Sequence, residues 1–240
     1  VFDANRSAAA LFCGQTLRLS GVFDGYVLLT DPMREILPVG EKPSVVIEGL
    51  IQENELPPKA QKTENAVLYT GTLNRELGIG ELLQAFEQMP EMQLWLCGRG
   101  DMEDEVRRSA EKHPNIRYFG FVSQEEALFL QSRAAALINP RSPAGLYTRY
   151  SFPSKTLEYL RSGRPTLCYA LEGIPEEYGQ YLVYIQAPGA DGIRQAVREW
   201  MKIPAAEREA RGRSGREYVL KHKNPKAQCE TLLALLRRMG

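Results

Sequence analysis

The segment YSFPSKTLEYLRSGRPTLCYA, residues 150–170, places a lysine at the predicted start of a helix and a glutamate one turn later. Pro153 suits the first turn of a helix, because the N–H that proline lacks would have no partner there. Ser154 and Lys155 would then share that turn, although a helix N-terminus already carries positive partial charge. A bound anion would resolve this conflict, since free N–H groups at a helix start are a phosphate site.

Lys155 and Glu158 are three residues apart, so their side chains share one helix face. One hypothesis is a surface ion pair, worth roughly 0.2–0.5 kcal/mol. The other is a ligand site, in which Lys155 and the backbone N–H groups hold phosphate and Glu158 accepts two hydroxyls of a ribose. The helix lies between a loop and a wholly apolar strand, which points its N-terminus to the ligand-binding edge of a sheet and favours the second hypothesis.

Two further loops follow predicted strands. In GTLNRELGIGE, residues 71–81, Gly71 permits close approach of backbone to a ligand, and Arg75 is the only cation. Arg75 could contact phosphate with two hydrogen bonds, or it could be an exposed loop arginine. The GRG at 98–100 is weaker evidence for a binding loop, because its two glycines could serve only the turn. Arg99 is therefore a lesser candidate for ligand binding.

The composition excludes several classes of protein. The chain has 240 residues with 30 basic and 30 acidic side chains, whereas a dedicated nucleic-acid binder usually has a basic excess. The four cysteines are scattered, which is typical of free thiols in a reducing compartment. Neither histidine has a partner at metal-ligand or catalytic-triad spacing. We expect no nucleic-acid partner, no metal and a cytoplasmic location, with attachment to the inner face of a membrane left open.

The residues from 64 onward alternate between strand and helix patterns. Strands are predicted at 66–71, 92–98, 115–122, 135–140, 165–171 and 182–185, and helices at 78–89, 101–113, 123–134, from Pro153, and at 191–201. Asp101 is the predicted N-cap of one helix, and Ser123 with Glu126 forms a predicted capping box on the next. Short apolar strands between helices predict an α/β fold with a doubly wound parallel sheet, whose ligand lies at the carboxyl ends of the strands.

The domain organisation is predicted from the same patterns. Residues 1–50 hold two small βα-like units, with a helix at 6–19, strands at 25–30 and 44–50 and a short helix at 31–37. They are too few for a domain, so we expect the end of a preceding one and, because the first residue is Val, a fragment. A polar, proline-containing linker at 51–65 leads to the main domain at 66–220 and to a tail helix at 221–240.

Four stretches together resemble a known family. VLYTGTLNRELGIGELLQAF, LWLCGRGD, NIRYFGFVSQEEALFLQSRAAALINP and FPSKTLEYLRSGRPTLCY resemble the C-terminal half of group 1, family 4-like retaining glycosyltransferases of the GT-B fold, over residues 64–225. The resemblance implies two Rossmann-like halves facing each other across a cleft, the C-terminal half holding a nucleotide-diphosphate sugar. Residues 1–50 would be the end of the N-terminal half, with Gly49 near the hinge, and the closing helices would cross back to it.

The resemblance assigns roles to individual residues, with three departures. Glu158 matches the second of two family glutamates, the expected ribose ligand, but the first falls on Tyr150. The family's diphosphate-binding Arg and Lys fall on Thr72 and Leu77. The candidate donor-binding residues are Gly71, Thr72, Arg75, Ser154, Lys155 and Glu158, followed by Arg99, Val122 and Tyr150. Arg75 and Lys155 are the substitutes for the missing cations, and no catalytic residue is assigned.

The function implied is transfer of a sugar from a nucleotide-diphosphate donor to an acceptor hydroxyl with retention, in bacterial surface polysaccharide or cell-envelope synthesis. The partners would be the donor, a glycan or lipid-linked acceptor and the missing N-terminal half of the same enzyme, and no cofactor is implied. The departures favour a catalytically inactive binding or scaffolding subunit as the first alternative. A GT-B sugar-nucleotide epimerase is the second.

Overall fold

The computed structural model describes residues 14, 17, 19–52, 63–145 and 148–240. The predicted helix at 6–19 and the predicted linker at 51–65 lie largely outside the described residues.

A parallel sheet of six strands forms the centre of the main domain, in the order β5-β4-β3-β6-β7-β8. The strands are β3 (Glu64–Thr70), β4 (Gln93–Cys97), β5 (Ile116–Tyr118), β6 (Ala134–Asn139), β7 (Thr166–Tyr169) and β8 (Leu182–Ile185). The order runs outward in both directions from the adjacent pair β3 and β6, which is the doubly wound arrangement. The predicted α/β fold is therefore confirmed, with a point of strand-order reversal between β3 and β6.

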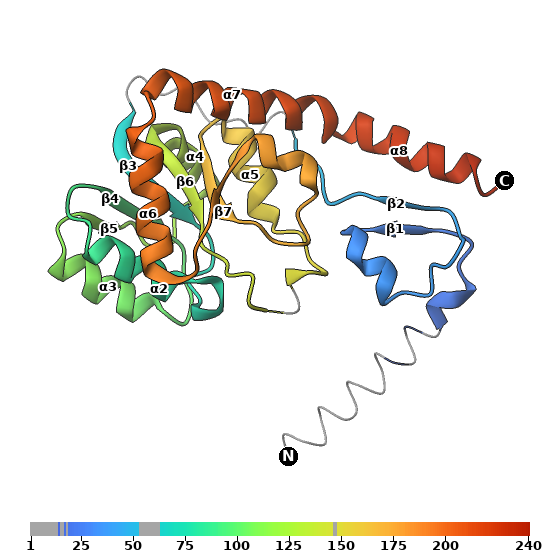
Figure 1. Ribbon diagram of the computed structural model, residues 1–240, viewed down its shortest axis with the longest axis horizontal. Coiled ribbons are helices and arrows are strands. Elements are labelled where there is room, and N and C mark those ends of the chain that lie inside the picture. The colour runs from blue at the N-terminus through green and yellow to red at the C-terminus, as the bar shows by residue number, and fades with distance from the viewer. Residues whose placement is uncertain (1–13, 15–16, 18, 53–62, 146–147) are drawn as a thin grey trace, which may run out of the picture.

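Helices cover both faces of this sheet (Figure 1). They are α2 (Ile79–Glu87), α3 (Glu103–Lys112), α4 (Gln124–Arg133), α5 (Ser154–Ser162) and α6 (Gly189–Lys202), and then α7 (Ala205–His222) and α8 (Pro225–Arg237) run across the molecule. Val67 of β3 packs with Phe86 of α2 and Ile193 of α6. Leu68, pointing the other way, packs in a separate cluster with Tyr159 of α5. Apolar residues at successive positions are buried because neither face of the sheet meets water.

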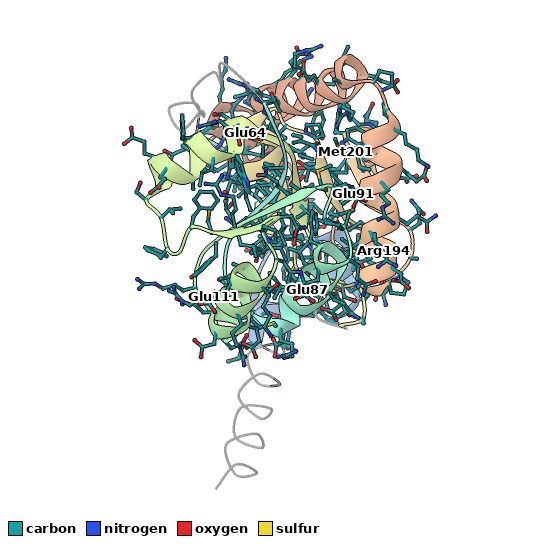
Figure 2. All side chains as sticks on the ribbon, turned by 90° about the vertical axis from the view of Figure 1, so that its left-hand side faces the viewer. Glu64, Glu87, Glu91, Glu111, Arg194 and Met201 are labelled. Atoms are coloured by element: carbon teal, nitrogen blue, oxygen red, sulfur yellow. The ribbon has the colours of Figure 1, made fainter. Side chains whose placement is uncertain are left out.

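The helices on one face are also joined at the surface. Arg194 on α6 donates to the side-chain oxygen of Gln88 at the end of α2, and Ser109 on α3 donates to Glu87 on α2, with an O–O distance of 2.8 Å. Figure 2 shows Glu87 and Arg194 where α3 and α6 flank α2. The contact of Arg194 is exposed, and exposed contacts contribute little to stability, so the apolar contacts beneath it hold the layer together.

The helix starts follow their sequence signals in part. Ser123 caps α4 as predicted, since its Oγ accepts from the N–H of Glu126 at 3.2 Å. The prediction that Asp101 caps α3 is wrong, because Met102 occupies the N-cap position. The Asp101 carboxylate instead accepts from the N–H of Arg75 at 3.0 Å, across the loop that follows β3. Pro153 is the N-cap of α5 and not its first residue, so Ser154 begins the helix.

The N-terminal unit is a two-stranded parallel sheet of β1 (Tyr26–Leu28) and β2 (Ser44–Val46), flanked by the 3-10 turns η1 (Ser20–Val22) and η2 (Asp31–Glu35). A small cluster of Tyr26, Leu28 and Val39 is buried beneath it. The C-terminal helix α8 extends over this unit and contacts β2 (Figure 1). The unit thus contacts the C-terminal helix, while its origin in a preceding domain stays a prediction.

A buried ion pair fastens the segment after β2 to the end of α7. Glu48 Oε1 lies 2.5 Å from Lys223 Nζ and accepts from the Tyr178 hydroxyl at 2.6 Å. The N–H of Ile51 donates to the Lys223 carbonyl at 2.8 Å. Both members of the pair are buried, so the segment around Gly49 has a fixed path over the main domain.

Within the described part of the chain, none of the helices combines the length and apolar character needed to cross a bilayer.

Candidate functional site

A cavity of about 680 Å³ opens where the order of the strands reverses. Its lining comes from the loops after β3, β4 and β5, from one side of α4, from the first two turns of α5, and from the segment after β2. This is the position at which doubly wound sheets bind ligands, since the carboxyl ends of the strands and the starts of the following helices converge there.

Most of the predicted site residues meet in this cavity. The lining includes Gly71, Thr72, Ser154, Lys155 and Glu158, together with the lesser candidates Arg99 and Val122. These residues come from four separate segments of the chain, and only the fold brings them together. Their proximity makes a shared ligand possible, while each donor-binding role stays a prediction.

Two predicted residues lie elsewhere. The Arg75 side chain is 67 % exposed, and its guanidinium nitrogen lies 3.4 Å from a carboxylate oxygen of Glu105 on α3. The Tyr150 ring lies beneath the guanidinium of Arg149, 5.9 Å from its centre, and Arg149 also pairs with Glu172. The structure therefore assigns neither side chain to the cavity wall.

Close backbone contact between two loops shapes one side of the cavity. The N–H of Gly71 donates to the carbonyl of Cys97 at 2.9 Å. A Cβ atom at Gly98 would lie 1.7 Å from the carbonyl oxygen of Gly71, which leaves no space for a side chain. The glycines at 98 and 100 thus serve the packing of the turn, which is one of the two roles that the sequence left open for them. Arg99 between them lines the cavity.

The start of α5 provides positive charge next to a carboxylate. Pro153, the N-cap residue, has no side-chain acceptor to offer the first N–H groups of this helix. Lys155 Nζ lies 2.6 Å from Glu158 Oε2, and each side chain is 29 % exposed. The ion pair of the first hypothesis forms, but it lies in the cavity wall. A phosphate at the helix N-terminus can replace the carboxylate as the partner of Lys155 without moving the helix.

A buried polar group lies beneath Glu158, and the sequence did not reveal it. Gln131 on α4 is 0 % exposed, and its Nε2 donates to Glu158 Oε1 at 2.8 Å. Thr70, the last residue of β3, donates from Oγ1 to the same oxygen at a longer 3.4 Å. The only signal was a glutamine next to Leu130 on the apolar side of a predicted helix. Glu48 in the cavity lining was also missed, although a carboxylate within the otherwise apolar predicted strand at 44–50 was a recognisable signal.

Burial keeps two tyrosines and one cysteine near the cavity protonated. Burial raises the pKa of Tyr69, and the negative charge of Glu158 raises it further. Burial and the charge of Glu126 raise the pKa of the Cys97 thiol to about 12. Burial also raises the pKa of Tyr159. Cys97 is therefore a thiol at neutral pH and a poor nucleophile, and the two tyrosines act as hydrogen-bonding groups.

The comparisons with known proteins agree with this architecture. A family model described as "Glycosyl transferases group 1" matches residues 51–218. No curated protein sequence matches the chain.

Several solved structures share the fold. Sucrose-phosphate synthase from Thermosynechococcus elongatus is 20 % identical with a TM-score of 0.70, over 93 % of this chain and 60 % of that one. TarM is 15 % identical with a TM-score of 0.73, over 92 % of this chain and 45 % of that one. HepE from Anabaena, described in complex with UDP, is 13 % identical with a TM-score of 0.70, over 91 % and 66 %. The present chain thus spans about half of the length of the first two structures.

Proposed function

The chain belongs to the group 1 glycosyl transferases, and from this premise we propose that the cavity binds the nucleotide-diphosphate part of an activated sugar. The observation that carries the proposal is the placement of Lys155 and Glu158 on one turn of α5, at an uncapped helix start inside a cavity where the strand order reverses. Phosphate suits the lysine and the helix N-terminus, and a ribose diol suits the carboxylate.

The proposed reaction is transfer of the sugar to an acceptor hydroxyl with retained configuration, in the synthesis of bacterial surface polysaccharide. Retention, the acceptor class and the cellular role rest on the family resemblance. We propose that no metal is required. Lys155, Arg99 and the α5 dipole would stabilise the negative charge of the diphosphate leaving group. A metal ion has this electrostatic role in other enzymes. A second half of the enzyme would supply the acceptor side of the cleft.

The placement of Arg75 favours one alternative, a binding or scaffolding subunit without transfer activity. Thr72 and Leu77 stand where the family has cations, and Arg75 pairs with Glu105 outside the cavity. Fewer cations would weaken stabilisation of the leaving group more than binding itself, because charge develops only in the transition state. Release of nucleoside diphosphate from a bound donor in the presence of acceptors separates the two functions.

The binding proposal is tested by calorimetry and thermal shift with UDP, other nucleoside diphosphates and their sugars. UDP comes first because HepE is described in complex with it. A ligand at one hundred times its Kd should stabilise the native state by about 2.7 kcal/mol. Pyrophosphate and uridine serve as controls for each half of the ligand. If no nucleoside diphosphate of the panel binds, the proposed function is wrong.

A further inference from the structure

We propose that Gln131 is a positioning residue that fixes the carboxylate of Glu158 for recognition of the two ribose hydroxyls. The inference rests on the proposed function, because it takes Glu158 as the ribose ligand. Gln131 itself is 0 % exposed, so it acts through Glu158 and does not need to contact the ligand.

The orientation of the Gln131 amide follows from its neighbours. A carboxylate can only accept hydrogen bonds, so the NH₂ end of the amide must face Glu158. Nε2 lies 2.8 Å from Glu158 Oε1 and 3.3 Å from Thr70 Oγ1. Thr70 is itself fixed, because its N–H donates to the Tyr159 hydroxyl at 2.9 Å and its carbonyl accepts from that hydroxyl at 3.1 Å. The amide is therefore held against a rigid strand end.

The oxygen of the same amide is in an unfavourable environment, which lowers the stability of the folded chain. Gln131 Oε1 is buried, and no hydrogen-bond partner for it occurs among the described residues. A buried acceptor without a partner lowers stability, and an apolar side chain of similar shape would avoid this cost. A glutamine that served packing alone would be a poor choice at this position. The hydrogen bond from Nε2 to Glu158 accounts for the presence of a glutamine at position 131.

The two oxygens of Glu158 have different partners, and this division suits ligand exchange. Oε2 pairs with Lys155 at 2.6 Å at the cavity surface, whereas Oε1 is held from below by Gln131 and Thr70. When Lys155 turns to a phosphate, Glu158 loses one partner and keeps the other two. The carboxylate then stays in place, with Oε2 available to the ribose hydroxyls.

The experiment compares UDP with its 2′,3′-dideoxy analogue, which lacks both hydroxyls, by calorimetry on the full chain. Gln131→Met preserves length and removes the donor. We expect it to weaken UDP binding about tenfold, within the range for hydrogen bonds to charged groups, and to leave the analogue's affinity unchanged. In a Glu158→Ala background, Gln131→Met should have no further effect on UDP. Gln180→Met, at an exposed glutamine remote from the cavity, is the matched control.

A second variant gives a pH-dependent readout. Gln131→Glu places a second carboxyl group within hydrogen-bonding distance of Glu158, and two carboxyls that share a site raise one pKa strongly. Below that raised pKa the introduced group is a protonated donor and restores the missing hydrogen bond. The affinity for UDP should therefore rise as the pH falls, and this rise should be absent from the parent.

Three results would overturn the inference. The first is a folded Gln131→Met variant that binds UDP as the parent does. The second is equal loss for UDP and for the dideoxy analogue, which would indicate a general packing role. The third is a flat pH profile for Gln131→Glu. Failure of the proposed function is distinguishable from these results, because the parent chain would then bind neither UDP nor any other nucleoside diphosphate. In that case the inference about Gln131 would be wrong as well.

Discussion

At the scale of single residues, the chemistry of this chain is concentrated on one helical turn. Lys155 offers a cation and Glu158 an acceptor, and each is the other's partner at 2.6 Å. Both are partly exposed in the cavity wall, where a ligand with a phosphate and a diol can compete for each of them. Their effects on binding should therefore differ between parts of the ligand, which two substitutions can separate.

Glu158→Ala should weaken binding of a nucleoside diphosphate by about 1.5–3 kcal/mol, the contribution of hydrogen bonds to a charged group. It should also lower the free energy of unfolding by about 1–3 kcal/mol, because the buried Nε2 of Gln131 loses its best acceptor. Calorimetry measures the first effect and denaturant unfolding the second. Glu111→Ala, at an exposed glutamate on α3 labelled in Figure 2, is the control. Unchanged affinity in the Glu158 variant would contradict the role of this residue as a ribose ligand.

Lys155→Ala should weaken UDP far more than uridine, because only the diphosphate needs a cation. If Lys155 is only an ion-pair partner, neither affinity changes by more than about 0.5 kcal/mol. The ratio of the two affinities, measured by titration calorimetry, decides between these cases. Lys112→Ala, at an exposed lysine at the end of α3, removes the same charge away from the cavity. A parallel loss for both ligands would contradict a phosphate role.

At the scale of elements, the loops after β3 and β4 are shaped by contacts that have no room for side chains. Gly98→Ala would put a Cβ atom 1.7 Å from the carbonyl oxygen of Gly71. Overpacking usually costs about 1–3 kcal/mol, and a rigid backbone neighbour places this change at the upper end or beyond. We expect a lower melting temperature and weaker nucleotide binding together, since both loops line the cavity.

Gly80→Ala is the matched control for that change. Gly80 lies in α2, and the nearest atoms to an added Cβ are 3.7 Å away, an ordinary contact distance. Alanine is the better helix former by about 1 kcal/mol, so this variant should be slightly more stable than the parent. Melting temperatures that fall equally for both glycine variants would show that the close contact at Gly98 has no special importance.

At the scale of the whole molecule, the pair of Glu48 and Lys223 joins the N-terminal unit to the C-terminal helices. Lys223→Met would leave the Glu48 carboxylate buried with Tyr178 as its remaining partner. Breaking one side of a buried pair costs about 3–5 kcal/mol, whereas replacing both by apolar residues is often nearly neutral. We expect Lys223→Met to be much less stable in denaturant than the double variant with Glu48→Leu. The reverse order would show that this pair is not desolvated in solution.

Glu177 adds a pH dependence to the same junction. Burial acts to raise its pKa, but hydrogen bonds from Tyr218 and Lys223 outweigh it and lower the pKa below the usual 4.5. A carboxyl group with a lowered pKa in the folded state contributes stability above its unfolded pKa. That contribution is lost as the pH falls through the folded value. The parent should thus lose stability below about pH 4.5, and Glu177→Gln should reduce the slope of that loss in acid unfolding.

Local patterns were sufficient for the elements and for part of the site. Apolar runs predicted all six strands of the main sheet, because strands buried on both faces are continuously apolar. The cap at Ser123 was predictable because its partner lies three residues along the chain. Lys155 and Glu158 were predictable as a pair for the same reason. The Asp101 prediction failed because the loop after β3 presented a competing donor, the N–H of Arg75, which no local pattern places nearby.

Residue patterns alone predict the fold class, the helix that carries Lys155 and Glu158, and the edge of the sheet at which these two residues lie. Those features depend on residue periodicity and on signals within a few positions. Three contacts are visible only in the folded chain: Gln131 lies beneath Glu158, Arg75 pairs with Glu105 outside the cavity, and Glu48 pairs with Lys223. Each of these contacts joins residues 27 or more positions apart. Such a contact depends on how helices and loops pack over the sheet, which no local spacing encodes.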